Sequence, residues 1–225
     1  MPPRYRPSTC TIRRLMPDHA PYIIEPMALA DVAQVMEIER VAFPTPWSAR
    51  AYRYEIAENE RSTMLVVRPA HQFNGWPARL AHHLRLAKPE RLLGYAGFWL
   101  LADDAHVCTI AVHPRWRGLG LGRLLLLSLL EQAIEQGAHR AILEVRVSNR
   151  SAQRLYHKYG FEIVSRRRRY YANNHEDAYI MVTPPFEASE FQTNLCRCRD
   201  RLHVCLQNAD SPQSANRLDK TFQMR

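Results

Sequence analysis

The sequence predicts an α/β (α+β) domain, because segments patterned like strands alternate along the chain with segments patterned like helices. The clearest unit is residues 108–130, where an apolar strand, a glycine-rich loop and a leucine-rich helix follow one another. A chain of 225 residues suits one compact domain with additions. Its hydrophobic fraction of 46% and charged fraction of 24% are ordinary for a globular protein.

The two ends of the chain differ from its middle. Residues 1–20 are basic and carry several prolines, so we expect a flexible arm there. We place one domain at residues 21–186 and expect little order in residues 187–225, where pattern and apolar density both fall. Residues 69–90 are expected to be an insertion with a short basic amphipathic helix. Such a helix could meet a membrane, an acidic partner or RNA, but a packed surface helix with a solvated face is the preferred interpretation.

The first half of the domain supplies three strands and two helices. Short apolar or β-branched runs predict strands at residues 22–25, 64–67 and 92–101. Asp31 and Ser48 are expected to cap the two helices, because their side-chain oxygens can accept a hydrogen bond from the first helical turn.

The second half continues after the leucine-rich helix. Residues 141–147 alternate between polar and apolar side chains, which is typical of a strand, and Glu144 lies on the polar face. Ser148 or Asn149 is expected to cap the next helix. Residues 161–183 contain two further strand patterns, which predict a closing antiparallel hairpin.

The overall charge and the cysteines indicate where such a chain works. The formal net charge of +9 favours acidic or nucleic-acid-rich surroundings and carries no information on the fold. The leucine-rich run is broken by charged residues and is too short to span a bilayer. No apolar stretch follows the N-terminal arginines, which argues against secretion. Five cysteines without a regular spacing fit a reducing compartment. We therefore expect a cytoplasmic, monomeric protein without membrane contact.

The tail holds residue types that can bind zinc, namely Cys196, Cys198, His203 and Cys205. Their spacing matches no standard zinc motif, so free thiols are the preferred interpretation and no metal site is predicted.

The glycine-rich loop before the leucine-rich helix has the features of a phosphate site. Gly118, Gly120 and Gly122 precede or open the helix, where backbone N–H groups without helical partners meet the positive end of the helix dipole. No Gly-Lys-Ser/Thr sequence closes the loop, so it is not a P-loop, and no acidic residue stands where a dinucleotide site requires one. The alternative is an ordinary tight turn into a core helix.

The spacing Arg117-x-x-Gly120-x-Gly122 resembles the pyrophosphate-binding motif of the GNAT superfamily of acetyl-CoA-dependent N-acetyltransferases. Segments elsewhere in the chain resemble one branch of that superfamily, the ribosomal-protein alanine N-acetyltransferases of the RimI type. These segments are residues 43–48, 143–149, 154–161 and 167–181. The resemblance covers most of the predicted domain and departs from the family at the arm, the insertion and the tail.

The resemblance implies a mixed, mostly antiparallel sheet of seven strands flanked by about four helices, with acetyl-CoA held where strands four and five splay apart. It implies that a short strand segment binds the pantetheine and acetyl carbonyl through its backbone, and that the glycine loop binds the pyrophosphate. The expected cofactor contacts are Ile110, Ala111, Val112, Arg117, Gly118, Leu119, Gly120, Leu121, Gly122, Arg123 and Asn149. For Asn149, helix capping is the alternative role.

Glu144 is the expected general base. A protein N-terminus titrates near ~7.7–8.0, so a modest base suffices to make it nucleophilic. Partial burial in the strand would raise the pKa of Glu144 and strengthen it as a base. The resemblance assigns the position the same role, whereas a salt bridge to Arg146 is the alternative. His106 and His113 flank the preceding strand and are expected to be exposed loop or strand-end residues.

Tyr156 is the expected general acid. At this position the family carries the tyrosine that returns a proton to the coenzyme A sulfur, and a phenol with pKa near ~10 stays protonated at working pH. The alternative is a packing role beside Leu155 and Tyr159.

The acceptor groove is expected between the loop that contains Phe43 and Trp47 and the hairpin that contains Tyr170. The arginine run at residues 166–169 could bind RNA, but a solvated basic sheet edge is the preferred interpretation. The predicted reaction is acetylation of the α-amine of a basic ribosomal protein that begins with alanine, with possible ribosome or RNA contact through the basic arm. Lysine or small-molecule amines as acceptors, or a non-catalytic ribosome- or RNA-binding role, are the alternatives.

Overall fold

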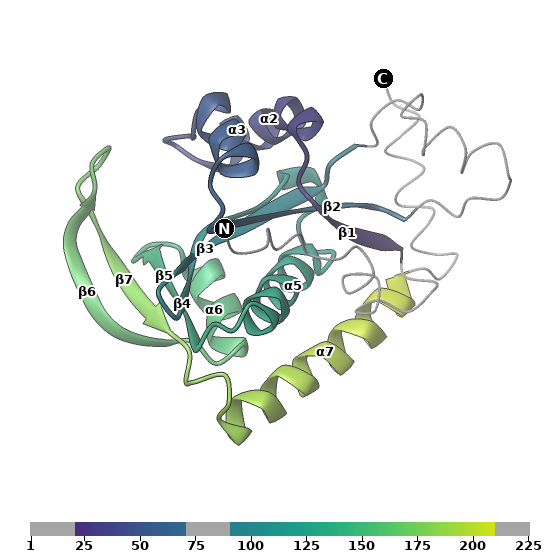
Figure 1. Cartoon of the computed structure of the whole chain (residues 1–225), viewed down its shortest axis with the longest axis vertical. Coiled ribbons are helices and arrows are strands. Elements are labelled where there is room, and N and C mark those ends of the chain that lie inside the picture. The colour runs from purple at the N-terminus through teal and green to yellow at the C-terminus, as the bar shows by residue number, and fades with distance from the viewer. Residues whose placement is uncertain (1–20, 71–90, 210–225) are drawn as a thin grey trace, which may run out of the picture.

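A computed structural model describes residues 21–70 and 91–209. The expectations for the arm at residues 1–20 and for the helix in the insertion lie outside these residues. Seven strands form one mixed sheet, as the resemblance implied, and their order in the sheet is β1-β2-β3-β4-β5-β7-β6 (Figure 1). The strands are β1 (Tyr22–Pro26), β2 (Ser62–Pro69), β3 (Gly94–Leu101), β4 (Asp104–Val112), β5 (Arg140–Arg146), β6 (Glu162–Tyr171) and β7 (Glu176–Val182). The helices are α2 (Val32–Ala42), α3 (Ala49–Ala57), α5 (Leu121–Glu135), α6 (Arg150–Lys158) and α7 (Ser189–Ala209), with 3₁₀ turns η1 (Leu29–Asp31) and η2 (Pro114–Trp116).

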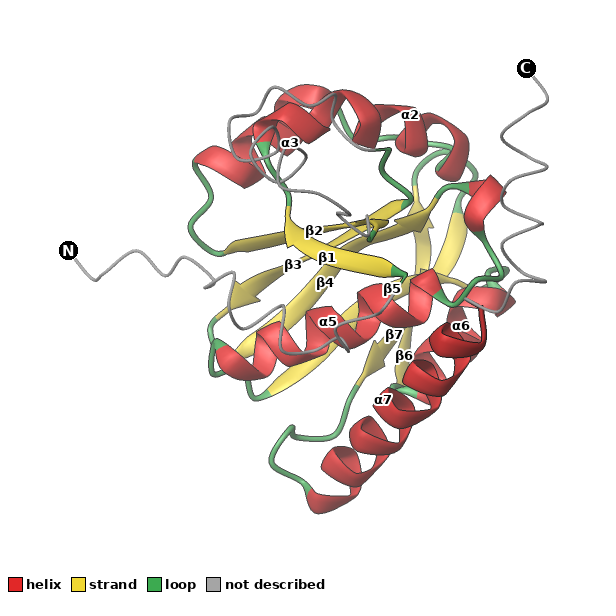
Figure 2. Ribbon diagram, turned by 90° about the vertical axis from the view of Figure 1, so that its right-hand side faces the viewer, coloured by secondary structure: helices red, strands yellow, loops and turns green. Residues whose placement is uncertain are grey.

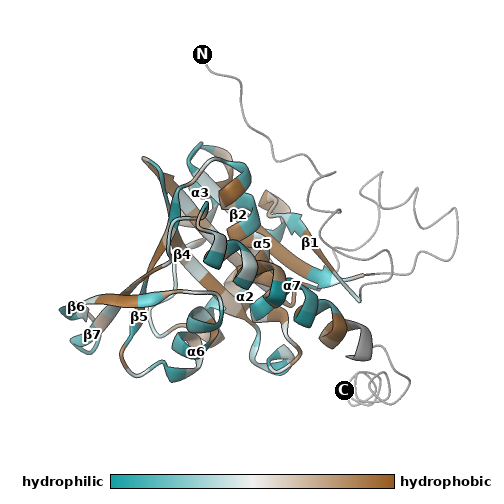
Figure 3. Ribbon diagram, turned by 90° about the horizontal axis from the view of Figure 1, so that it is seen from below, coloured by the Kyte–Doolittle hydropathy of each residue, from teal (hydrophilic) through white to brown (hydrophobic). Residues whose placement is uncertain are grey.

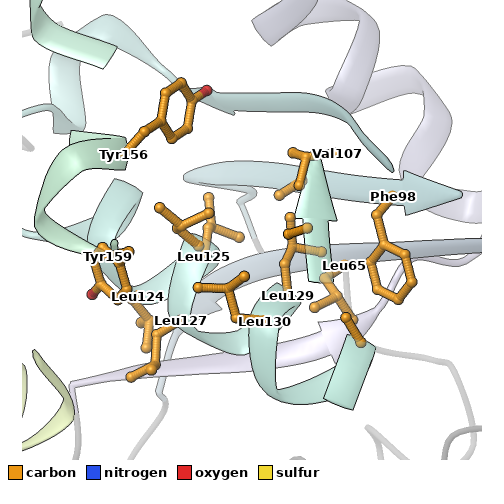
Figure 4. Packing of buried hydrophobic residues seen from close by; sticks show 14 of the residues in the cluster. Leu65, Phe98, Val107, Leu124, Leu125, Leu127, Leu129, Leu130, Tyr156 and Tyr159 are labelled. Carbon is orange, nitrogen blue, oxygen red and sulfur yellow. The ribbon is translucent and has the colours of Figure 1, made fainter. Parts of the chain in front are cut away.

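Helices cover both faces of the sheet, with α2 and α3 on one side and α5 on the other (Figure 2). Successive side chains of β2 point to opposite faces of the sheet, so this strand contributes to two hydrophobic cores. Leu65 and Val67 pack in the core around α5, whereas Met64 and Val66 pack in the core around α2 and α3. Figure 4 shows the leucines of α5 converging on Leu65, Phe98 and Val107 of the sheet. None of the helices in residues 21–70 and 91–209 is long and apolar enough to cross a membrane.

Two helix caps occur where the sequence predicts them. The Ser48 side chain accepts a hydrogen bond from the backbone of Ala51 at 3.1 Å, and the Asn149 side chain accepts one from Ala152 at 3.1 Å. These local bonds satisfy N–H groups that the first turn of a helix leaves without partners.

Helix α7 overturns the expectation of little order in residues 187–225, which is wrong for residues 189–209. Phe191, Leu195, Leu202 and Leu206 are each at most 2% exposed, and their spacing places them along one stripe of the helix. The stripe packs against the core around α5, and Arg199 pairs with Glu131 of α5 at 2.5 Å. The described residues therefore form five α-helices instead of about four, and α5 is apolar on several sides because the sheet and α7 both cover it.

Strands β4 and β5 form the one parallel pair of the sheet, and their pairing covers only three residues of each strand. Their paired residues are Asp104 with Arg140, Ala105 with Ala141, and His106 with Ile142. Both strands continue past this last rung, so they diverge and leave a V-shaped opening, as the sequence analysis expected.

Hairpin β6–β7 projects from the body of the domain (Figures 1 and 3). Strand β6 is an edge strand whose side chains are exposed along nearly its whole length. Arg166 pairs with Asp177 of β7 at 2.6 Å, which places part of the arginine run on a solvated sheet edge.

Candidate active site

A cleft of ≈ 1420 Å³ occupies the opening between β4 and β5. It gathers the predicted site residues from segments that are far apart in the sequence. Its lining includes Phe43, Trp47, Ile110, Ala111, Val112, Arg117, Gly118, Gly120, Leu121, Gly122, Arg123, Glu144, Asn149, Tyr156 and Tyr170. Leu119 differs from the prediction, because its side chain packs against the core around α5.

The glycine loop enters α5 through two residues with left-handed backbone. Gly118 and Gly120 both have φ of +86°, a conformation that side chains other than glycine rarely adopt. Leu124 makes the first helical hydrogen bond, to Gly120 at 3.0 Å, so the amides just before Leu124 lie at the open start of the helix. A Cβ added at Gly118 would meet no atom within 4 Å, and one at Gly122 would meet only Leu155 at 3.6 Å. This cradle of amides, with Arg117 and Arg123 beside it, fits an anionic phosphate group.

Glu144 is held by side chains from two other strands of the sheet. Its Oε2 lies 2.6 Å from Nε2 of His106 on β4, and its Oε1 accepts a hydrogen bond from Arg167 on β6 at 3.3 Å. The hydrogen bond from His106 lowers the pKa of Glu144 and outweighs partial burial, which raises it. The expected rise in this pKa is therefore wrong, because burial brings the carboxylate next to partners that stabilise its charge.

The alternative ion pair between Glu144 and Arg146 is also absent from the described residues. Arg146 instead pairs with Glu176 at 3.0 Å and lies over the ring of Tyr171, with its guanidinium carbon 3.6 Å from the ring centroid. The two side chains share a face of β5, but Arg146 turns toward the hairpin.

His106 is the residue of this site that the sequence analysis missed. It lies inside β4 and is half-buried, so the expectation of an exposed loop or strand-end position is wrong. Its alternation with Cys108 and Ile110, which line the cleft, is the sequence signal that could have placed it on the same face.

Tyr156 lies on α6 at the edge of the core and is 6% exposed. Figure 4 shows its hydroxyl pointing away from the leucines of α5. Burial raises the pKa of this phenol above its ordinary value, so it stays protonated throughout the neutral range. Its ring packs at 5.7 Å from that of Phe161, so the residue contributes to packing as well as lining the cleft.

The far end of the cleft is bounded by the predicted acceptor residues. Trp47 lies in the loop between α2 and α3 and stacks on Trp99 of β3, with ring centroids 5.8 Å apart. Tyr170 lies on β6 and is 42% exposed, and the Arg167 guanidinium is 5.7 Å from its ring. These two walls leave a groove beside Glu144.

Glu39 of α2 is a further cleft residue, which the sequence analysis did not single out. It is 1% exposed, and its carboxylate accepts hydrogen bonds from the hydroxyls of Tyr52 and Tyr95. An acidic residue on the buried stripe of a helix is the signal that could have singled it out.

Among the described residues, no three His, Cys, Asp or Glu side chains come together in an arrangement that could hold a metal ion. Cys196, Cys198 and Cys205 of α7 are free thiols.

Three comparisons with known proteins agree with this geometry. The model of the acetyltransferase (GNAT) family matches residues 32–161. A putative ribosomal protein bS18-alanine N-acetyltransferase of Bacillus subtilis is 39% identical over 155 residues, which are 69% of this chain and 90% of that protein. The bS18-alanine N-acetyltransferase of Salmonella typhimurium is 31% identical over 160 residues, 70% of this chain and 94% of that protein.

A solved structure extends the likeness to three dimensions. The crystal structure of the ribosomal-protein-S18-alanine N-acetyltransferase from Escherichia coli superimposes with a TM-score of 0.59 at 27% identity, covering 75% of this chain and 96% of that one. The matched family model spans more than half of the chain, and the site has the phosphate cradle at the start of α5 that such enzymes need. The chain therefore belongs to the GNAT family of acetyltransferases and is an acetyl-CoA-dependent N-acetyltransferase.

Proposed function

We propose that this enzyme acetylates the α-amine of a ribosomal protein that begins with alanine, with Glu144 as base and Tyr156 as acid. The observation that carries the proposal is the single cleft in which the glycine loop, these two residues and an open acceptor groove meet. The names of the relatives from Bacillus subtilis and Salmonella typhimurium support this choice of substrate. A ribosomal protein as substrate supports a cytoplasmic location, and we propose that the enzyme acts as a monomer.

The chain would hold acetyl-CoA with two sets of groups. The amides of the glycine loop, together with Arg117 and Arg123, would bind the pyrophosphate. The backbone of residues 110–112 would hold the pantetheine and the acetyl carbonyl. Acetyl-CoA supplies the acetyl group as a thioester, whose carbonyl carbon is open to attack by an amine.

The two catalytic residues would then move one proton each. Glu144 takes the proton that the amine nitrogen loses as its bond to the acetyl carbon forms. Tyr156 donates its hydroxyl proton to the sulfur as the carbon–sulfur bond breaks. The lowered pKa of Glu144 keeps it ionised and ready to accept a proton, and the raised pKa of Tyr156 keeps it able to donate.

A peptide panel tests the acceptor. Three peptides with the same body would begin with a free alanine, begin with a blocked alanine, or carry a blocked N-terminus and an internal lysine. We expect acetylation of the first peptide alone, at its α-amine, as located by mass spectrometry. An internal lysine acetylated as fast as the free alanine would overturn the proposal in favour of a lysine acetyltransferase. Acetyl-CoA that binds but is not consumed with any peptide would favour a non-catalytic role.

A further inference from the structure

We propose that His106 positions the carboxylate of Glu144 and carries the proton that Glu144 receives from the amine on toward solvent. The inference rests on the proposed role of Glu144 as the base. It adds a residue on a different strand to the chemistry of the site.

The position of the pair in the sheet explains why a side chain is needed there. The last backbone rung between β4 and β5 joins His106 to Ile142. Glu144 lies two residues farther along β5, where the strands have begun to separate. The contact of 2.6 Å between His106 Nε2 and Glu144 Oε2 therefore links the strands just past the end of their ladder. A hydrogen bond at this point fixes the carboxylate at the apex of the V.

The two carboxylate oxygens have different partners, which leaves one defined path for a proton. Arg167 is bound to Oε1 and cannot accept a proton, because arginine stays charged in proteins. His106 is bound to Oε2 and can accept one on its ring. One carboxylate oxygen of Glu144 therefore contacts a permanently charged guanidinium, and the other contacts a titratable imidazole.

The exposed fractions of the two side chains indicate the direction in which the proton would move. Glu144 lines the cleft and its side chain is 11% exposed, whereas His106 is absent from the cleft lining and its side chain is 25% exposed. With the ring proton of neutral His106 on Nδ1, a proton on Oε2 can pass to the free Nε2, which gives an imidazolium beside ionised Glu144. The imidazolium then loses its Nδ1 proton to water, and Nε2–H donates to Glu144. Exchange with water returns the ring proton to Nδ1 before the next turnover, so no other reactant is needed.

The surroundings hold the histidine ring in place. The indole of Trp99 on β3 packs edge-on against it, with ring centroids 6.0 Å apart and an interplanar angle of 80°. Trp99 is itself fixed by a hydrogen bond from its Nε1 to Glu55 at 2.8 Å. The charged or titratable groups that face the pair are Arg167, Tyr170 and Tyr171 of β6, and the indole of Trp99 is uncharged.

Two substitutions in the full-length enzyme separate positioning from proton transfer. His106→Gln keeps an N–H that can donate to Glu144 but cannot relay a proton, whereas His106→Ala removes both functions. We expect kcat to fall about tenfold or more in His106→Gln and further in His106→Ala, with unchanged affinity for acetyl-CoA. Added imidazole should restore part of the activity of His106→Ala, which a purely structural residue would not allow. His139→Gln, at an exposed histidine just before β5, is the matched control and should behave as wild type.

Comparison with Glu144→Gln distinguishes failure of this inference from failure of the proposed function. In the double variant of His106→Gln and Glu144→Gln, we expect no loss beyond that of Glu144→Gln alone, because the two residues act in one path. Wild-type kcat and pH profile in His106→Gln, with Glu144→Gln inactive, would overturn the relay and leave the base intact. Wild-type activity in Glu144→Gln would overturn the proposed base itself. If His106→Ala fails to fold, the kcat of His106→Gln still decides between the two outcomes.

Discussion

The backbone N–H of Trp47 donates a hydrogen bond to Oε2 of Glu39 at 3.2 Å, so a carboxylate inside the core holds the loop at residues 43–47, which lines the cleft. The other oxygen of Glu39 accepts from the hydroxyl of Tyr95 at 2.5 Å and from that of Tyr52. All three donors converge on a group that is 1% exposed. The position of the loop at residues 43–47 therefore depends on a charge that solvent scarcely reaches.

Replacing Glu39 with glutamine should loosen this loop. The amide has one oxygen and two N–H groups, so at least one of the three donors would face another donor and lose its partner. We expect the free energy of unfolding to fall by about 1–3 kcal/mol and the KM for the peptide to rise, with acetyl-CoA affinity unchanged. Steady-state kinetics and thermal unfolding measure both effects. Glu37→Gln, at an exposed position of α2, is the control, and an unchanged peptide KM in Glu39→Gln would contradict the anchoring role.

The glycine loop can be tested with a matched pair of substitutions. Gly118 and Gly137 have similar positive φ angles of +86° and +80°, and an added Cβ would meet nothing within 4 Å at either position. Substitution by alanine at either position should therefore lower the free energy of unfolding by about 1–2 kcal/mol, through backbone strain alone. Only Gly118 lines the cleft, so only Gly118→Ala should weaken acetyl-CoA binding in a calorimetric titration. Equal affinities in the two variants would remove the loop from the cofactor site.

Helix α7 should be required for stability, contrary to what the sequence suggests for residues 187–225. A Cβ placed on Gly120 would lie 3.6 Å from Leu202, so this fully buried side chain of α7 packs beside the glycine loop. We expect Leu202→Ala to cost about 2–5 kcal/mol and to weaken acetyl-CoA binding. Val204→Ala, at a position that is 58% exposed, should change little. Equal melting temperatures for the two variants, or full stability of a chain that ends at Glu187, would contradict this prediction.

The lowered pKa of Glu144 predicts how stability depends on pH. A carboxyl group whose pKa is lower in the folded state stabilises the fold above its unfolded pKa, and this contribution is lost as the pH falls through the folded value. The difference in unfolding free energy between wild type and Glu144→Gln should therefore be largest near neutrality and should close under acid. Denaturant unfolding between about pH 3 and pH 7 measures it. A difference that widens on acidification would show that the pKa is raised instead.

Tyr156→Phe should lower turnover by about 10²–10⁴ in the proposed mechanism, because the leaving sulfur loses its proton donor. Raising the pH should not restore the rate, since a neutral amine does not replace that donor. The comparable loss in Glu144→Gln should instead shrink at high pH, where the amine is already deprotonated. Profiles of kcat/KM against pH for both variants measure the contrast, with the exposed Tyr54→Phe as control. Parallel profiles would contradict the division of roles.

Local sequence patterns determined much of the fold because they act over a few residues. Residues 141–146 alternate between buried and half-buried side chains as their sequence predicts, and Ser48 and Asn149 cap helices through bonds to residues three positions on. The glycine spacing and the resemblance to the GNAT family, in contrast, named fifteen of the residues that line the cleft. The alternation of residues 141–147 placed Glu144 on one face of β5 with Arg146.

Only the tertiary structure decided what surrounds those residues. Glu144 meets His106 and Arg167, which are 38 and 23 residues away, so no local pattern could show that its pKa is lowered. Helix α7 has an apolar stripe too sparse to stand out by composition, and it is ordered because α5 offers a second apolar face to cover. The sequence determined which residues of β5 share a face and where two of the helices begin, because strand alternation and helix caps are short-range effects. Packing between distant segments decided their charge, their burial and their partners, because those depend on neighbours that the chain brings together only on folding.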